Sequence, residues 1–291
     1  MRDVPSKPSN LWIKTVIDLQ EELGATVLLT PTGWVTETNG SKALTRMLAI
    51  ADETRNIFSD RILWTNLTFD AKWLTDTSLR NTLIDEIVES DQLDWYLRFW
   101  WPEVNPRYGQ LQEAAILNGY KDLVRAAELE GKRVYLPNSG LSGWILTAIG
   151  AAGFSTGQSW DEQAFAAQRI IRRAKGQKPS PRIPRLFDPT ILHTIEHSEH
   201  QRLEQMSGHL STRNPYLDEI DQTGHTAERA SLHYLYEVAG LTAAIAGKRA
   251  ARDAHARVKV ANQFVNSLAR IDQLTGINVP GHLKLWPKIL R

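Results

Sequence analysis

Hydrophobic and polar positions along this chain of 291 residues fall into two alternating patterns, one typical of helices and one of buried strands. Residues 11–23 carry apolar side chains at helical spacing, which predicts a helix that ends at Gly24. The segment ATVLLTP (25–31) is a short continuous apolar run and predicts a strand covered on both faces. The same reasoning predicts a strand over 61–69 and helices over 41–58 and 78–90.

The alternation then repeats, in units of about 35 residues, through the next part of the chain. It predicts strands over 94–102, 133–137 and 151–157 and helices over 110–130 and 141–149. Strands that alternate with helices are typical of a parallel α/β fold. We expect a TIM-type, (β/α) barrel-like domain. Since a closed barrel has eight strands and only five are predicted, either the barrel is incomplete, or another chain completes it, or some strands have no recognisable pattern in the sequence.

A proline-rich stretch marks the predicted domain boundary. The segment GQKPSPRIPRLF (176–187) holds four prolines and predicts a loop. Beyond it, the pattern predicts helices over 190–206, 227–246 and 250–272, with a polar, turn-rich stretch between the first two. We therefore divide the chain into a barrel-like domain at 1–187 and a helical C-terminal region at 188–291.

Composition narrows the classes of function. The hydrophobic fraction of 42% and the charged fraction of 23% are ordinary for a globular protein, and the net charge of +1 argues against a uniformly basic surface. The absence of cysteine excludes disulfides, thiolate metal sites and a cysteine nucleophile. The N-terminal segment has no apolar signal-peptide core and no stretch is long and apolar enough to span a membrane, so we expect a cytoplasmic protein without membrane contact.

Small polar side chains stand where each predicted strand ends. In a parallel barrel these ends converge on one rim, where catalytic residues lie. The rim residues are Thr30, Thr32 and Trp34; Asn66, Thr68 and Asp70; Arg98 and Trp100; Asn138 and Ser139; Ser155, Gln158 and Asp161. The alternative is that they form turns and helix caps, since Asn, Ser, Thr and Asp are favoured there regardless of function.

A histidine pattern and two basic clusters are further candidates. The segment HTIEHSEH (193–200) would place His193 and His197 on one helical face with Glu196 between them, the inverted zinc-peptidase pattern, or else form a solvated helix. One basic cluster spans 247–259; the other contains Arg169, Arg172, Arg173, Lys175, Lys178, Arg182 and Arg185. They are either solvated surface or contacts to a phosphate backbone, and no glycine-rich phosphate loop accompanies them.

Two segments resemble the tRNA-guanine transglycosylases: RVYLPNSGLSGWILTAIGAAGFSTG, and ERASLHYLYEVAGLTAAIAG at Glu228–Gly247. The resemblance covers 94–272 by order of segments. It implies a (β/α)8 barrel with a zinc-bearing insertion, and a reaction that breaks a guanine N-glycosidic bond in a nucleic acid and inserts a 7-deazaguanine. Some relatives act on DNA instead of tRNA.

The chain departs from that family at three places. Ser155 stands where the family has its nucleophilic aspartate, and an unactivated serine does not replace a carboxylate at an anomeric carbon. The cysteines of the zinc insertion are missing, so His233, which fits the helix pattern, is expected to pack or cap instead. The family's Asp-Ser-Gly-Gly segment has no counterpart. The resemblance thus implies a divergent member without the usual nucleophile.

We expect a transglycosylase-like protein that binds tRNA or DNA and a purine or 7-deazapurine base, either in base exchange or as a partner subunit in a homo- or hetero-oligomer. Arginines of 169–185 would hold phosphates, and Trp34, Trp100 or Trp160 would stack on the base. The expected catalytic residues are Asp70, Ser155 and Asp161; the expected substrate-binding residues are Asn66, Arg98, Trp100, Asn138, Ser139 and Gln158. No cofactor or metal is expected. The rival hypotheses are a small-molecule hydrolase or lyase that uses Asp70 or Asp161, and a non-catalytic structural subunit.

Overall fold

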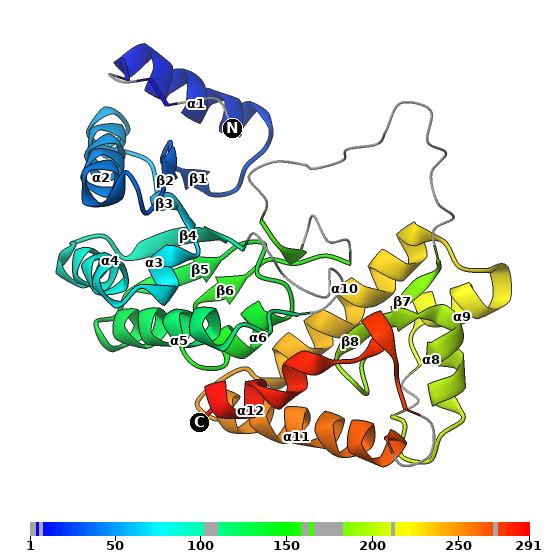
Figure 1. The fold of residues 1–291 in the computed structure, drawn as a ribbon. Helices are drawn as coiled ribbons and strands as arrows, with labels where there is room; N and C mark the ends of the chain where they lie inside the picture. Colours follow the sequence, from blue (N-terminus) through cyan, green and yellow to red (C-terminus); the bar gives the residue numbers. More distant parts are fainter. Residues whose placement is uncertain are drawn as a thin grey trace, which may run out of the picture.

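The structure, a computed structural model, joins a parallel sheet and its helices to a mainly helical C-terminal region (Figure 1). It describes residues 4–5, 8–101, 110–158, 163–165, 183–210, 213–269 and 273–291. The mixed α/β class, the mostly parallel sheet and the helical C-terminal region are confirmed.

The sheet has six strands that all run in parallel: β1 (Leu28–Leu29), β2 (Trp34–Val35), β3 (Leu63–Asp70), β4 (Asp94–Trp100), β5 (Arg133–Leu136) and β6 (Gly153–Phe154). Their order across the sheet is β1-β3-β4-β5-β6. β1 pairs with the start of β3 and β2 with its end, so residues 28–35 act as one interrupted edge strand. The predicted strands are confirmed in place, but β2 was not predicted, because two residues carry no periodic pattern.

Helices cover one face of this sheet. They are α1 (Asn10–Glu22), α2 (Gly40–Ile57), α3 (Lys72–Thr75), α4 (Thr77–Glu89), α5 (Ala114–Leu129) and α6 (Ser142–Thr147), of which α2, α4 and α5 lie along one side in Figure 1. β4 shows the two faces most clearly. Trp95, Leu97 and Phe99 are buried in the main hydrophobic core, whereas Tyr96 and Arg98 point to the other face and are half-buried.

The helix layer packs closely enough to require a small residue at one position. Gly119 of α5 lies against the backbone carbonyl of Leu74 in the short helix α3, and a Cβ atom at Gly119 would overlap that carbonyl. The contact fixes the depth at which α5 sits on α3, so the helix layer holds the sheet in one position.

The C-terminal region begins with an antiparallel hairpin, β7 (Arg185–Asp188) and β8 (His193–Glu196). It continues through α8 (His197–Glu204), α9 (Pro215–Thr223), α10 (Ala227–Ala244), α11 (Ala250–Leu268), the short 3-10 turns η1 (Gly276–Asn278) and η2 (Gly281–Lys284), and α12 (Trp286–Ile289). The helix predicted over 190–206 is present only in its second half, as α8, because His193–Glu196 form the strand β8. The stretch predicted as polar and turn-rich over 207–226 also contains the helix α9.

One hydrophobic core joins both parts of the chain. The indole Nε1 of Trp144 in α6 donates to the carbonyl of Leu241 in α10 (3.0 Å), and Tyr234 and Trp286 share the core with the sheet residues. The boundary expected after residue 187 falls within β7.

None of the described helices is both long and apolar enough to cross a membrane.

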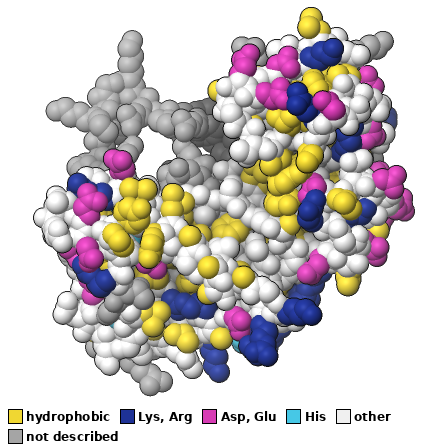
Figure 2. Space-filling view, turned by 180° about the vertical axis from the view of Figure 1, so that it is seen from behind, with side chains coloured by type: hydrophobic (Ala, Val, Ile, Leu, Met, Phe, Trp, Pro, Cys, Tyr) yellow, Lys and Arg dark blue, Asp and Glu magenta, His cyan; other side chains and the backbone are white. Residues whose placement is uncertain are grey.

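The surface mixes charges of both signs. In the view of Figure 2, acidic and basic side chains are interspersed over most of the molecule, and Lys and Arg side chains gather along the lower edge. This distribution agrees with the net charge of +1. A basic region, if it binds a phosphate backbone, is therefore local and not a property of the whole surface.

Candidate functional site

The face of the sheet opposite the helices carries the candidate site. In the register of the strands, Trp34 of β2 lies beside Thr68 of β3, which lies beside Arg98 of β4. Asp70 and Trp100 form the next pair along. Because neighbours in register point to the same face, these side chains form a continuous surface at the carboxyl ends of the strands, where ligands bind in parallel α/β proteins.

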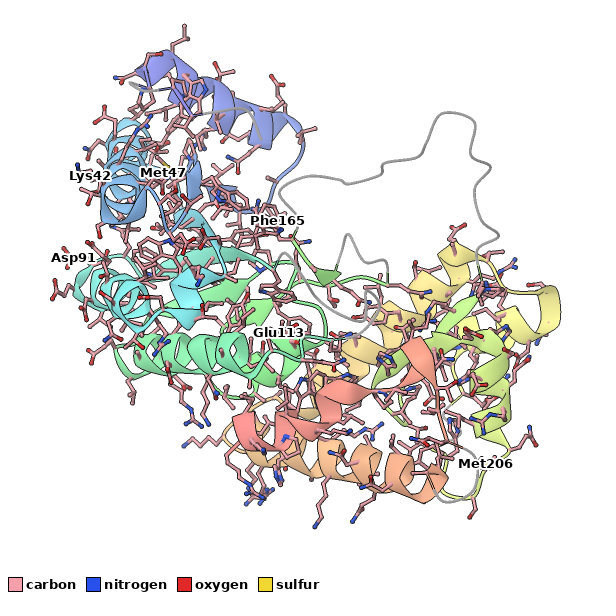
Figure 3. All side chains as sticks on the ribbon, in the orientation of Figure 1. Lys42, Met47, Asp91, Glu113, Phe165 and Met206 are labelled. Carbon is pink, nitrogen blue, oxygen red and sulfur yellow. The ribbon has the colours of Figure 1, made fainter. Side chains whose placement is uncertain are left out.

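Aromatic rings enclose Arg98 on this face. The ring centroids of Trp34 and Trp100 lie 5.6 Å apart, and those of Trp34 and Phe165 lie 5.5 Å apart. The Arg98 guanidinium lies 5.1 Å from the centroid of Phe165 and 5.7 Å from that of Tyr96. Phe165, which is labelled in Figure 3, pairs with Trp100 in an isolated parallel bridge. The rings form a cluster in which a planar ligand has stacking partners.

Three buried polar atoms on this face have no hydrogen-bond partner among the described residues: Asn66 Oδ1, Thr68 Oγ1 and Arg98 Nε. Asn66 is fixed from behind, because its Nδ2 donates to the Thr30 carbonyl (3.1 Å) and its backbone N donates to Thr30 Oγ1 (3.0 Å). An unpaired buried polar group costs about 1–3 kcal/mol. A polar ligand that pairs with all three atoms would remove this cost.

Arg98 brings positive charge to the cluster. Burial lowers the pKa of its guanidinium and the neighbouring Tyr96 opposes that shift. The ordinary pKa of arginine lies so far above neutrality that the group stays charged. The face therefore offers a cation, a hydroxyl and an amide oxygen beside aromatic rings.

A stacked pair of aromatic rings, Trp64 and Tyr135, lies further along this face, near the amino end of β3. Trp64 of β3 and Tyr135 of β5 belong to strands separated by β4, yet their ring centroids lie 3.9 Å apart and their planes are 16° apart. Strands two positions apart are about 10 Å from each other, so both side chains lean over β4 to meet. Tyr135 pairs with Tyr96 in register and Trp64 is two residues before Asn66 in β3, so the stacked rings lie on the same face as Asn66 and Tyr96.

The second half of the predicted rim forms a turn. The backbone N of Asn138 donates to Ser155 Oγ (2.9 Å), and the backbone N of Ser139 donates to the Ser155 carbonyl (3.2 Å). Ser139 Oγ donates to the Leu136 carbonyl (2.8 Å), and Asn138 has a φ of 51°, a left-handed conformation that asparagine tolerates. Ser155 has no base beside it among the described contacts, and its hydroxyl holds the ends of β5 and β6 together.

The remaining predicted residues are engaged with the protein or lie outside the described residues. Asp70 accepts hydrogen bonds from the backbone N of Glu37 (2.9 Å) and of Lys72 (3.1 Å), one at each carboxylate oxygen. Gln158 Nε2 donates to the Arg185 carbonyl (3.1 Å), and the Arg185 guanidinium donates to the carbonyls of Thr194 and Ile277. Outside the described residues lie Trp160, Asp161, Arg169, Arg172, Arg173, Lys175, Lys178 and Arg182.

The predicted helical histidine pattern is wrong. His193 lies in strand β8 and His197 is the first residue of α8, so the two do not share a helical face. His193 Nε2 donates to the Ile277 carbonyl (3.0 Å), and its ring is fully buried. The inverted zinc-peptidase arrangement therefore has no counterpart here.

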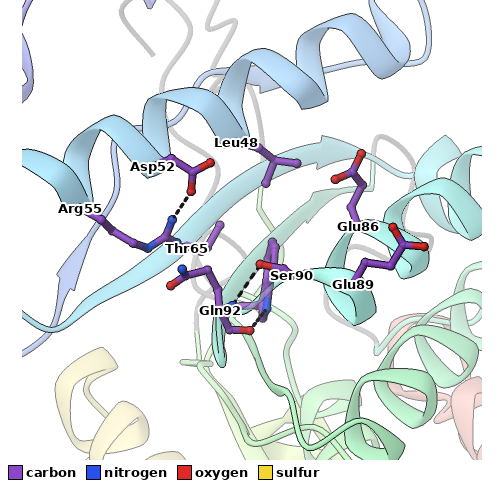
Figure 4. A pocket seen from close by; sticks show the side chains of 9 residues that line it. Leu48, Asp52, Arg55, Thr65, Glu86, Glu89, Ser90 and Gln92 are labelled. Atoms are coloured by element: carbon purple, nitrogen blue, oxygen red, sulfur yellow. Dashed lines mark hydrogen bonds and ion pairs between the residues drawn. The ribbon is translucent and has the colours of Figure 1, made fainter.

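A separate pocket of about 220 Å³ lies at the opposite ends of β3 and β4, between α2 and α4 (Figure 4). Asp52 and Arg55 of α2 form an ion pair (2.8 Å) on one side of it, and Glu86 and Glu89 of α4 line the other side. Ligands of parallel α/β sheets bind at the carboxyl ends of the strands, so this pocket lies at the other end of the sheet from the candidate site.

Sequence reasoning missed Tyr96 and Phe165 as members of the site. The two-residue alternation in DWYLRFW places Tyr96 on the same face as Arg98, and this signal was available. No local pattern connects Phe165 to Trp34, because their contact joins distant segments.

The chain was also compared with known proteins. No family model, no curated protein and no solved structure matches it.

Proposed function

We propose that this protein binds a purine-like base, free or within a nucleic acid, on the face of its parallel sheet opposite the helices. The observation that carries the proposal is the set of unpaired polar atoms of Asn66, Thr68 and Arg98 beside stacking rings. A purine offers a flat π-surface for the rings and donors and acceptors along its edge for the polar atoms. The base is sandwiched or stacked on Trp34 and Trp100 and read by these three residues.

The order of the strands supports a barrel-like wall as part of this proposal. Each described strand is added beside its predecessor, from β1 and β2 to β6, without the reversal that defines a doubly wound sheet. A wall of parallel strands with helices outside and the site residues at the carboxyl ends of the strands is the arrangement of a (β/α) barrel. The resemblance to the tRNA-guanine transglycosylases proposes the same fold and the same class of ligand.

The proposed activity is recognition, with catalysis depending on a partner or on residues outside the described part. Ser155 occupies the place of the family's nucleophile and closes a turn. Both carboxylate oxygens of Asp70 accept backbone hydrogen bonds. A partner subunit in nucleic-acid base modification, acting in the cytoplasm, fits these contacts better than a hydrolase or lyase that uses Asp70.

Calorimetric titration of the full chain with guanine and 7-deazaguanine, and separately with tRNA and duplex DNA, tests the proposal. We expect saturable binding of the base, and Trp100→Ala to weaken it about tenfold or more, since stacking contributes about 1–3 kcal/mol per base. Trp12→Ala on α1, which takes no part in the ring contacts of Trp34, Trp100 and Phe165, is the matched control and should bind as the wild type does.

Nucleic-acid binding is distinguished from base binding by salt. Contacts to phosphates weaken steeply as salt rises, whereas recognition of a neutral base does not. Base binding that persists in high salt with loss of tRNA or DNA binding supports both halves of the proposal. Wild-type protein that binds neither base nor nucleic acid contradicts it.

A further inference from the structure

A second group of chemically active side chains lies in the C-terminal region, away from the sheet face. Asp188 ends β7, His200 lies in α8, and His209 follows that helix. Asp188 and His200 are buried, and the His209 side chain is only 2% exposed. Met206, labelled in Figure 3, marks the segment that carries His209 back to the hairpin, and its carbonyl accepts from the His209 backbone N (3.2 Å).

The side chains of this group converge on one point. His200 Nδ1 lies 2.9 Å and His209 Nε2 lies 3.0 Å from the same oxygen, Oδ2 of Asp188. The three atoms all lie within 4.8 Å of one another. Ligand atoms of a tetrahedral zinc with bonds of about 2.0–2.1 Å are about 3.3 Å apart, so a small outward shift of the two imidazoles accommodates the ion.

The carboxylate of Asp188 is held in place by the backbone. Oδ1 of Asp188 accepts from the backbone N of Thr190 (2.8 Å) and of Ile191 (3.3 Å), which leaves Oδ2 aimed at the two histidines. A fixed carboxylate beside two imidazoles is a donor set that zinc prefers.

His200 stands between two carboxylates. Its Nδ1 faces Asp188, and its Nε2, which has no hydrogen-bond partner among the described residues, lies 3.7 Å from Oε1 of Glu204. Without a metal, an imidazole that carries both protons donates from its two nitrogens toward the two carboxylates. A metal on Nδ1 leaves the proton on Nε2 for Glu204, the carboxylate–histidine–zinc arrangement of known sites.

We propose that Asp188, His200 and His209 bind one zinc ion, with Glu204 orienting His200 from behind. The ion would join the end of β7, the middle of α8 and the segment after α8. Of the six buried residues in the neighbouring apolar cluster, only Leu203 of α8 comes from these three parts. His233 is not a ligand, because its Nε2 donates to the Phe187 carbonyl (2.8 Å) and its Nδ1 accepts from Asn214 (2.9 Å).

Metal analysis of the purified full chain by mass spectrometry tests this proposal. We expect one zinc per chain, its removal by a chelator with a lower melting temperature, and recovery of that temperature on addition of Zn²⁺ but not Mg²⁺. Asp188→Asn and His209→Gln should abolish stoichiometric zinc. Glu204→Gln should retain the site but weaken its affinity by about 10–100-fold, as loss of a supporting carboxylate does elsewhere.

His197→Gln is the matched control, since His197 lies one turn before His200 on the same helix and contributes no ligand. It should retain zinc. Loss of zinc in His197→Gln would assign the metal to other histidines and overturn the site. Wild-type protein without transition metal, whose chelator-treated form gains no stability from Zn²⁺, would leave a metal-free hydrogen-bond network and also overturn it. These tests on the wild type do not depend on whether the variants fold.

Discussion

At the scale of single residues, the molecule separates polar groups that build turns from polar groups that remain unpaired. Asn138, Ser139 and Ser155 satisfy one another at the ends of β5 and β6. Thr68 and Arg98 retain unpaired atoms on the sheet face. Both sets look alike in the sequence, because each is a polar residue after an apolar run. Only the strand register distinguishes them.

Thr68→Val tests the unpaired hydroxyl. Thr68 is fully buried and its Oγ1 has no partner among the described residues, so removal of the hydroxyl relieves a desolvation cost. We expect the free energy of unfolding to stay equal or rise by about 1 kcal/mol, while affinity for the base falls. Denaturant unfolding and calorimetric titration of the same samples measure the two effects.

Thr54→Val is the control for this substitution. Thr54 is equally buried, but its Oγ1 donates to the Ile50 carbonyl within α2 (2.7 Å). Its loss should lower the free energy of unfolding by about 0.5–1.5 kcal/mol and leave base affinity unchanged. If Thr68→Val destabilises the protein as Thr54→Val does, the Thr68 hydroxyl is a structural group. Only Asn66 and Arg98 then remain as proposed polar contacts to the base.

At the scale of elements, periodicity predicted most helices and the central strands, and it failed at short elements. The hairpin strand β8 lies within the helix predicted over 190–206, so the i, i+4 spacing of His193 and His197 does not place them on one helical face. The helix α9 was missed although its boundaries were visible. Asn214 caps it by accepting from Tyr216 N and Leu217 N, Pro215 is its first residue, and Gly224 ends it with a φ of 96°.

The turn η2 gives the C-terminal region a dependence on pH. His282 is fully buried against Trp286, with ring centroids 4.3 Å apart, and its Nε2 donates to the Leu192 carbonyl. Burial lowers the pKa of His282 well below its ordinary value of 6.5, with the nearby His193 adding to the shift. The native state therefore keeps this imidazole neutral, whereas the unfolded state takes up a proton below about pH 6.5.

Because only the unfolded state gains that proton, the stabilisation by His282 is complete above pH 6.5 and is lost as the pH falls toward the native pKa. The loss is about 1.4 kcal/mol per pH unit for one proton. Unfolding free energies of wild type and His282→Gln, measured between pH 7 and pH 5 (about two units), should differ in slope by up to one proton. Parallel slopes would show that His282 is not neutral in the native protein.

At the scale of the whole molecule, the sequence predicted the class of fold and one side of the candidate site. Asn66, Arg98 and Trp100 were expected together and lie on one face. Tyr96 and Phe165 were not expected, since the contacts of Phe165 depend on tertiary structure. The Asp188 group also had no sequence pattern, because its members come from a strand, a helix and a loop that the fold brings together.

The central claim is that the face of the sheet opposite the helices recognises a purine-like base through Asn66, Thr68 and Arg98. Nuclear magnetic resonance of the Arg98 Nε–H group, assigned with Arg98→Lys, tests it most directly. Addition of 7-deazaguanine should shift this signal in proportion to site occupancy and slow its exchange with water. A signal that stays unchanged while the base is present in saturating excess would contradict the claim.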